Sequence, residues 1–483
     1  MVFSSHVFLF LFLPLVLVSY YLSPRRARNG VLLLYSLLFY GWANPLFAVL
    51  LVLTVAVCFF AGGLADRRNR GGDGRAGLWL GVAFPLCVLG FFKYFNFARD
   101  NWNALASAWG ADLAQLDVAL QVVLPLGLSF YTFQAITYVV DIYRGDSRPQ
   151  RNPLDFASYI ALFPQLVAGP IIRYGEIARQ LRGRTQTLGR FARGVALFSL
   201  GFAKKILLAN PCGEIADAVF AAEAPATIDA WTGVFAYSMQ IYFDFSGYSD
   251  MALGLGLMFG FVFPINFNAP YRSVSITDFW RRWHISLSSF LRDYLYIPLG
   301  GNRKGPGRTY ANLLVVMLLG GLWHGAAWTF VIWGAYHGIW LAAERAWGQW
   351  RGRRRPSSAS GAIDDPGGFP LRAARVVVVF VVVSLGWVWF RSDTFGGAVA
   401  LFGSLFGLRE VAPAELLLGG WIRQPHLLLT LAVAFLVAWS APPTHAFVRR
   451  IGIGKAAWIL LLFLLSVVAM SNQSFNPFIY FNF

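Results

Sequence analysis

Long apolar runs separated by short basic segments make up most of this chain. The runs over residues 6–22, 31–40 with its flanks, 46–64 and 78–97 are examples, and a bilayer-spanning helix needs about 20 apolar residues. Arginine clusters at 25–28 and 66–75 alternate with them, and basic loops stay on the cytoplasmic side. The pattern predicts an all-α, polytopic integral membrane protein with about eleven transmembrane helices and both termini on the periplasmic side.

Three stretches do not fit straight spans. Residues 156–172 are apolar but short, interrupted by proline and glycine and flanked by basic residues, which predicts a re-entrant or surface-lying element. Residues 191–210 carry Lys204 and Lys205 near their end, so we expect this segment to lie obliquely or near the interface. Residues 266–308 are polar, basic and rich in tryptophan, and cannot cross lipid as one straight helix.

Composition narrows the function classes. The chain is 57% hydrophobic and 13% charged, more apolar than a soluble protein of 483 residues can bury. Its net charge of +17 follows from basic loops between apolar runs, and no soluble basic domain is present to bind nucleic acid. Residues 351–368, rich in Arg, Pro, Ser and Gly, predict a cytoplasmic linker loop within one membrane domain, 1–483. Neither a metal site nor a disulfide framework is expected from the three cysteines.

One histidine stands out among six. His324 lies in the sequence LLGGLWHGAAWTF, in a helix that otherwise carries no charge. Ionisable residues at membrane depth are costly and indicate function by default, although a hydrogen-bonded structural histidine fits the spacing equally well. His337 has Gly334 and Gly338 beside it, and small residues let a neighbouring helix approach closely. We therefore expect His337 to be a helix-packing residue.

Two further polar clusters accompany His324. The first, residues 279–305, interleaves basic, acidic and aromatic side chains as in a pocket wall, and contains Arg282, Trp283, His284, Arg292 and Asp293. Arginines beside a histidine could hold a phosphate-bearing donor while the histidine moves a proton. The alternative for this cluster is a basic interfacial loop.

The second cluster is YFDFSGYSD, which holds Asp244, Ser246, Tyr248 and Asp250 between two expected spans, 230–245 and 251–263. Buried carboxylates need partners, for which Arg282 or Arg292 are candidates. The two aspartates are six positions apart (250 − 244) and would not share a face of one helix, so Ser246-Gly247 predicts a kink or break.

At these residues the chain resembles the membrane-bound O-acyltransferases, in particular their bacterial alginate O-acetyltransferase branch. The resemblance runs nearly from end to end and is strongest in LPLGLSFYTFQAITYVVDIYRGD, FPQLVAGPIIRY, QIYFDFSGYSDMALGLGLMFGF, ITDFWRRWHISLSSFLRDYLYIPLGGNR and MLLGGLWHGAAWTFVIWGAYHG. It implies helices around a central funnel, with His324 as the signature catalytic histidine and His284 as the second characteristic polar position. The expected substrate contacts are Trp323, Arg282, Trp283, Arg292, Asp293, Asp244, Ser246, Tyr248 and Asp250.

The resemblance also implies a reaction. Members of this branch pass acetyl groups from a cytosolic thioester, acetyl-CoA or another acyl thioester, toward an exported polysaccharide at the bacterial inner membrane. They hand the group on to a periplasmic, serine-hydrolase-like acetyltransferase and need no tightly bound cofactor. Other acceptors stay open: peptidoglycan, cellulose, or teichoic acid receiving a D-alanyl group. A transporter with His324 and Asp244 as a proton relay is the alternative from another class, although the sequence shows no inverted repeat.

Overall fold

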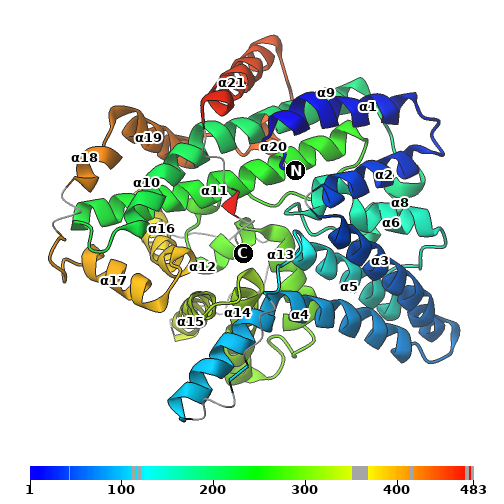
Figure 1. The fold of residues 1–483 in the computed structure, drawn as a ribbon, viewed down its shortest axis with the longest axis horizontal. Coiled ribbons are helices and arrows are strands. Elements are labelled where there is room, and N and C mark those ends of the chain that lie inside the picture. The colour runs from blue at the N-terminus through cyan, green and yellow to red at the C-terminus, as the bar shows by residue number, and fades with distance from the viewer. Residues whose placement is uncertain are drawn as a thin grey trace. The chain divides into compact units, whose positions relative to one another are not determined.

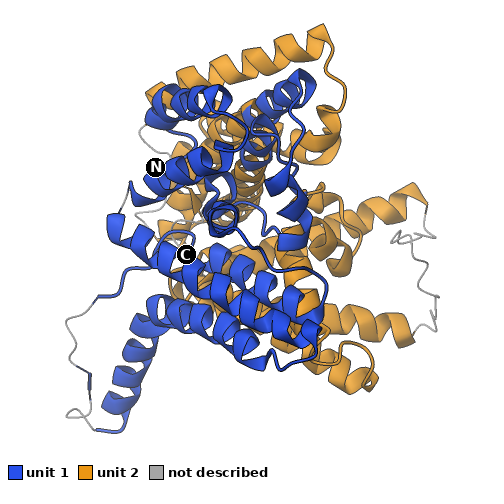
Figure 2. Cartoon of the chain, turned by 90° about the vertical axis from the view of Figure 1, so that its right-hand side faces the viewer, with its two compact units in different colours: residues 1–198, 251–264 blue, residues 199–250, 265–483 orange. Residues whose placement is uncertain are grey.

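The computed structural model describes residues 1–42, 44–110, 115–116, 121–350, 368–412, 417–473 and 478–479. Within these ranges the chain is helical and has no β-strand, which confirms the all-α prediction (Figure 1). It divides into two compact units (Figure 2). Unit 1 holds residues 1–198 and 251–264, and unit 2 holds residues 199–250 and 265–483. Most of the expected linker, residues 351–367, lies outside the described residues.

Unit 1 consists of the N-terminal helices. Asparagine caps begin two of them: the side chains of Asn44 and Asn152 accept the backbone N–H groups of Leu46 and Leu154, and a proline follows each cap. The elements are the π-helix η1 (Val7–Phe12), α1 (Leu13–Leu22), α2 (Arg28–Gly41), α3 (Pro45–Ala65), the 3₁₀ helix η2 (Asp66–Arg70), α4 (Arg75–Ala108), α5 (Leu128–Arg144), α6 (Pro153–Ala161), α7 (Phe163–Leu166), α8 (Tyr174–Arg182) and the first part of α9 (Leu188–Ala203).

The segment 156–172 forms the end of α6, the four-residue helix α7 and an irregular stretch, and nearly all of it is buried. It is therefore not one straight helix, as its proline and glycine residues predict. Tyr159 holds the segment's far end, because its hydroxyl donates to the carbonyl of Ile172 at 2.7 Å.

Unit 2 carries the polar clusters. A run of short helices replaces a straight span between residues 266 and 304, as predicted from its polarity. The elements are the rest of α9, the π-helix η4 (Lys204–Ala209), α10 (Asn210–Ala221), α11 (Thr227–Met258, which ends in unit 1), the 3₁₀ helix η5 (Pro270–Arg272), α12 (Ile276–Arg282), α13 (Ile285–Leu291), the π-helix η6 (Arg292–Tyr296), α14 (Gly305–His324), α15 (Trp328–Trp350), α16 (Phe369–Arg391), α17 (Phe395–Leu405), α18 (Leu418–Ile422), α19 (Pro425–Ser440), α20 (Thr444–Phe447) and α21 (Ile453–Asn472).

The predicted break at Ser246-Gly247 is wrong, because α11 runs through both residues as one helix of 32 residues. Gly247 instead allows α9 to pack closely against α11. A Cβ at Gly247 would lie 2.7 Å from the carbonyl oxygen of Gly201 on α9, so only glycine lets these two backbones touch. The two expected spans, 230–245 and 251–263, are thus largely parts of a single helix.

Helices α14 and α15 form a tight hairpin at the His324 end of α14. A Cβ added at Gly321 would collide with the carbonyl oxygen of Phe330, and one added at Gly334 with that of Met317. His337 is fully buried, with the ring of Trp333 5.1 Å away. The helix-packing interpretation of His337 and its glycines is confirmed.

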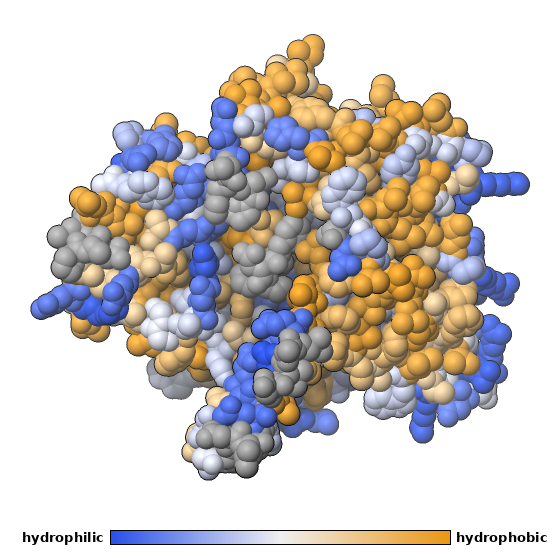
Figure 3. Space-filling view, viewed as in Figure 1, coloured by the Kyte–Doolittle hydropathy of each residue, from blue (hydrophilic) through white to orange (hydrophobic). Residues whose placement is uncertain are grey.

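Among the described residues, four helices are long and apolar enough to cross a membrane: Pro45–Arg70, Arg75–Ala108, Phe369–Arg391 and Ile453–Asn472. Shorter apolar helices cover Val7–Leu22, Phe395–Leu405 and Pro425–Ser440. The total of eleven spans stays a prediction. Exposed leucine, valine and phenylalanine side chains on α2 and α3 contribute to the broad apolar surface in Figure 3, as expected for lipid-facing helices.

Candidate functional site

His324 is the last residue of α14, where the chain turns into the extended residue Gly325. Its side chain lies in a closely packed aromatic setting and its residue is 5% exposed. The ring centroids of Trp323, Trp333 and Phe390 lie 4.9, 5.2 and 5.2 Å from that of His324, each edge to face. The tight α14–α15 hairpin and α16 together fix the position of this imidazole.

His284 lies between α12 and α13 and is fully buried. Its backbone has φ +44°, in the left-handed region that non-glycine residues rarely adopt. Such strain persists only where surrounding contacts enforce it, and it often accompanies function. Here the ring of Phe245 on α11 packs edge to face at 4.7 Å. A hydrogen bond also joins His284 to Asn266, with 3.2 Å between Nδ1 and Oδ1.

Asn266 determines which nitrogen of His284 carries the proton. Its Oδ1 also accepts the backbone N–H and the hydroxyl of Ser286, at 3.2 and 2.9 Å, so this atom is the amide oxygen. His284 Nδ1 must therefore donate, which leaves Nε2 as the unprotonated nitrogen of the neutral ring. The amide nitrogen of Asn266 is 3.3 Å from the hydroxyl of Ser249 on α11.

Burial keeps this imidazole neutral. His284 lies between short helices, outside the spanning helices, and desolvation of its charged form lowers its pKa from 6.5 to about 3. A neutral histidine with Nδ1 fixed as donor can offer Nε2 as a hydrogen-bond acceptor or a base.

Trp323 lies beside both histidines. Its ring centroid is 6.1 Å from that of His284 and 4.9 Å from that of His324. The two histidines are forty positions apart in sequence (324 − 284), yet they contact the same indole ring. The structure therefore brings together the three residues His284, Trp323 and His324 that the sequence singled out.

The two aspartates of the YFDFSGYSD cluster pair with adjacent lysines of η4. Lys205 Nζ lies 2.7 Å from Asp244 Oδ1, and Lys204 Nζ lies 2.6 Å from Asp250 Oδ2. The inner pair has side chains only 4% and 1% exposed, against 18% and 14% for the outer pair. A buried carboxylate thus neutralises Lys205, while the oblique or interfacial course of residues 191–210 stays a prediction.

The expected arginine partners of these aspartates are also wrong. Arg282 pairs with Asp278 one turn earlier on α12, at 2.8 Å, and Arg292 pairs with its neighbour Asp293 at 2.6 Å. Both arginines thus pair with local carboxylates, whereas Asp244 and Asp250 pair, within the described residues, with the lysines of η4. Trp283 is buried in an aromatic cluster rather than lining an open wall, with Trp387 at 5.0 Å.

Part of the C-terminal tail packs against the same stretch of α11. The backbone N–H of Ile479 donates to Asp244 Oδ2 at 2.8 Å, and the ring of Phe478 stacks on Tyr248 at 4.6 Å. Ser246, between these contacts, is buried. The sequence predicted that this tail lies on the periplasmic side but did not predict its contact with Asp244, because nothing in an isolated FNPFIYFNF segment indicates its partner.

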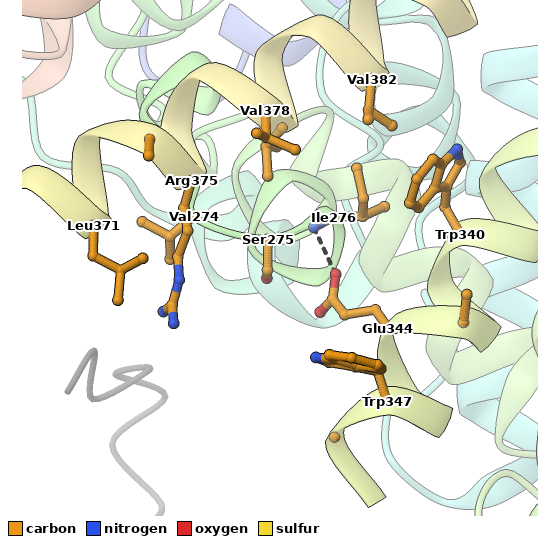
Figure 4. A pocket seen from close by; sticks show the side chains of 14 residues that line it. Val274, Ser275, Ile276, Trp340, Glu344, Trp347, Leu371, Arg375, Val378 and Val382 are labelled. Atoms are coloured by element: carbon orange, nitrogen blue, oxygen red, sulfur yellow. Dashed lines mark hydrogen bonds between the residues drawn. The ribbon is translucent and has the colours of Figure 1, made fainter. Parts of the chain in front are cut away.

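A lateral groove of about 790 Å³ opens between α15 and α16 (Figure 4). Its walls are mostly apolar, with Trp340 and Val378 among them. At its floor, Glu344 accepts the backbone N–H groups of Ile276 and Thr277 at 2.7 and 3.3 Å. This carboxylate anchors the start of α12, the helix that leads into His284. Neither histidine lines the groove.

Comparison with known proteins shows similarity to one family of membrane enzymes. The model of MBOAT, the membrane-bound O-acyltransferase family, matches residues 148–359, which include both histidines. The "Probable alginate O-acetylase AlgI" of Azotobacter vinelandii is 44% identical over the whole of both chains. The protein of the same description from Pseudomonas aeruginosa is 47% identical over 86% of this chain and 77% of its own length. The "Peptidoglycan O-acetyltransferase" of Helicobacter pylori is 35% identical over 86% of this chain and 82% of its own.

Proposed function

Because the chain belongs to the membrane-bound O-acyltransferase family and is an O-acetyltransferase, we propose that it moves acetyl groups across the bacterial inner membrane for O-acetylation of an exported polysaccharide such as alginate. The acetyl donor is a cytosolic thioester, acetyl-CoA or another acyl thioester. The observation that supports this most strongly is the pairing of end-to-end similarity to alginate O-acetylases with two buried histidines against one indole ring.

The two histidines divide the chemistry in this proposal. His324 acts as general base on the accepting hydroxyl, or carries the acetyl group briefly on its own nitrogen. In the first case the proton passes from the hydroxyl to His324, the C–O ester bond forms, the C–S bond breaks and the proton leaves with the thiol. His284 holds the donor thioester. The neutral Nε2 that Asn266 leaves unprotonated suits accepting a hydrogen bond from a donor N–H.

The closed aromatic setting favours this role for His324. Trp323, Trp333 and Phe390 exclude water from the imidazole, so a thioester held there is protected from hydrolysis. Fixed dipoles also stabilise a developing oxyanion better in a dry site than in water. Of the other predicted substrate contacts, Trp323 is the one placed directly beside both histidines.

The partners follow from the same proposal. The acetyl group passes to a periplasmic, serine-hydrolase-like acetyltransferase, which modifies the polymer, while lipid surrounds the exposed apolar helices. Both chain termini lie on the periplasmic side, as the basic loops predict. Peptidoglycan is the second candidate acceptor, since the Helicobacter pylori relative covers 86% of this chain. Cellulose and teichoic acid, the latter with a D-alanyl group, use the same chemistry.

Purified protein in sealed vesicles tests the donor and the direction of transfer. Radiolabelled acetyl-CoA is supplied on the side of the basic loops, and the periplasmic partner with alginate oligosaccharide is enclosed on the other. We expect labelled oligosaccharide with wild-type protein and with His426→Ala, whose histidine is exposed at the start of α19, and none with His324→Ala. Labelled product from the His324→Ala protein at the wild-type rate would refute the proposed role of this residue.

A further inference from the structure

A second pocket lies in unit 1, among the basic loops. It encloses about 1010 Å³ and is lined by η2, by the segment 145–152 after α5, and by the end of α8. Helices α5, α6 and α8 lie side by side here (Figure 1). Four arginines line it: Arg70, Arg148, Arg151 and Arg182. The role proposed above for the two histidines does not involve this pocket.

The carboxylates of this pocket are already occupied. Asp66 pairs with Arg70, at 2.7 Å from its Nε, and Asp155 accepts the side-chain amide of Asn29 at 2.7 Å. Within the described part of the chain, no carboxylate pairs with Arg148, Arg151 or Arg182. The four arginines and two aspartates leave a net charge of +2 (4 − 2) around the opening.

A buried amide at the pocket points to a ligand with oxygen acceptors. Gln150 is 6% exposed, and its Oε1 accepts the backbone N–H groups of Arg151 and Asn152 at 2.9 and 3.3 Å. These two donors identify Oε1 as the oxygen and so orient the amide. Its buried Nε2 has no hydrogen-bond partner among the described residues. A buried donor without a hydrogen bond destabilises the fold, so a bound acceptor would relieve this cost.

We propose that this pocket binds a phosphate group. Gln150 Nε2 donates to one phosphate oxygen from the wall of the pocket, and the guanidinium groups of Arg148, Arg151 and Arg182 supply the charge at its rim. Guanidinium forks match phosphate oxygens in geometry and charge, and the net positive charge of the lining favours an anion over a cation as the ligand. The phosphate belongs either to the headgroup of an anionic phospholipid or to a soluble nucleotide-type molecule.

Two binding measurements separate these sources. Full-length protein in a neutral detergent is titrated calorimetrically with adenosine 3′,5′-bisphosphate. In parallel, protein in nanodiscs of phosphatidylcholine with a minor share of phosphatidylglycerol is released and its retained phosphatidylglycerol is counted by mass spectrometry. Binding in the first arm assigns a soluble phosphate, and binding in the second assigns a lipid headgroup. Neither readout depends on acetyl transfer, so failure of the phosphate-binding proposal is distinguishable from failure of the proposed function.

Variants decide whether the pocket is responsible. Gln150→Glu keeps the acceptor oxygen for the two backbone N–H groups but replaces the free donor with a charge that repels phosphate. We expect Gln150→Glu and Arg151→Gln each to weaken binding by about tenfold or more. Arg67→Gln removes an equal charge from an exposed residue of the same basic loop that does not line the pocket, and should bind as wild type. Absence of binding in both arms, unchanged binding by Gln150→Glu, or equal loss in Arg67→Gln would overturn the proposal.

Discussion

The Nδ1 atom of His284 lies 3.2 Å from Oδ1 of Asn266, eighteen positions earlier in the chain (284 − 266). Because that oxygen also accepts the backbone N–H of Ser286, the contact fixes His284 in one tautomer. A residue that the sequence did not single out thus sets the chemical state of one that it did. Asn266 acts through His284 and is a positioning residue.

Replacing Asn266 should therefore change the rate through the state of His284. We expect Asn266→Ala to lower kcat by roughly tenfold or more, because His284 loses the acceptor that fixes its tautomer and orientation. Asn266→Asp keeps an acceptor for Nδ1 and should restore part of that rate. It should also move the acidic limb of the pH–rate profile upward, since a nearby negative charge favours protonated imidazole. A wild-type profile in Asn266→Asp would contradict this role.

Ser249→Ala is the matched control for that series. It removes only the partner of the Asn266 amide nitrogen, 3.3 Å away, and leaves the Oδ1 contacts in place. Its kcat and pH profile should stay close to those of the wild type.

The buried His284 also predicts a pH dependence of stability. Its pKa is lowered to about 3 by burial, so between pH 6.5 and 3 the unfolded chain takes up a proton that the folded one does not. The contribution of His284 to the free energy of unfolding is therefore complete above pH 6.5. It is lost as the pH falls, by on the order of 2 kcal/mol between pH 7 and pH 5. Asparagine tolerates the left-handed backbone, so the His284→Asn variant should fold and should not show this pH-dependent loss of stability. Thermal unfolding in detergent at several pH values measures the difference, and equal slopes would refute it.

The two lysine–aspartate pairs should differ in their effect on stability. Lys205→Met leaves Asp244 charged and buried, and should destabilise the protein by about 3–5 kcal/mol. Lys204→Met affects the less deeply buried pair and should destabilise the protein less than Lys205→Met does. The double variant Lys205→Met with Asp244→Leu should recover much of the loss, because no charge stays unpaired. Unfolding midpoints compare the three, and equal effects of the two single lysine variants would contradict the assignment.

The glycines of the α14–α15 hairpin should control the position of His324. Gly321→Ala puts a methyl group against the carbonyl of Phe330, which must separate the two helices. We therefore expect activity to fall at least tenfold and the free energy of unfolding to fall by about 1–3 kcal/mol. Gly320→Ala is the neighbouring control. Its Cβ would lie 3.4 Å from a leucine methyl, Leu291 Cδ1, and activity should be retained. Loss of activity in both variants alike would indicate a general intolerance of the helix.

The sequence predicted the elements of the site better than its contacts. Helices α2 and α3 follow from apolar runs around an Asn-Pro turn, and His324 follows from an ionisable residue in an apolar helix. Asn266 was missed because an asparagine in a polar loop normally signals a turn, and only the folded chain brings it to His284.

The errors on α11 have a common physical cause. Burial alone required partners for Asp244 and Asp250, but the identity of the partner depends on which helix crosses α11 there. Arg282 and Arg292 pair with carboxylates that are nearer in sequence, and the two aspartates of α11 pair with the lysines of η4 instead. Gly247 was interpreted as a break, whereas it marks the place where α9 comes into contact. Local sequence does not distinguish a glycine needed for a kink from one needed for helix contact.

Acetylation of exported polysaccharide in cells tests the central claim most directly. Cells lacking the native gene receive wild-type protein, His324→Ala or His426→Ala, with equal protein levels confirmed in the membrane fraction, and ester-linked acetyl groups on the exported polymer are measured. The account predicts acetylation with the wild type and His426→Ala, and its loss with His324→Ala. Acetylation at the wild-type level in cells that carry the His324→Ala protein would contradict it.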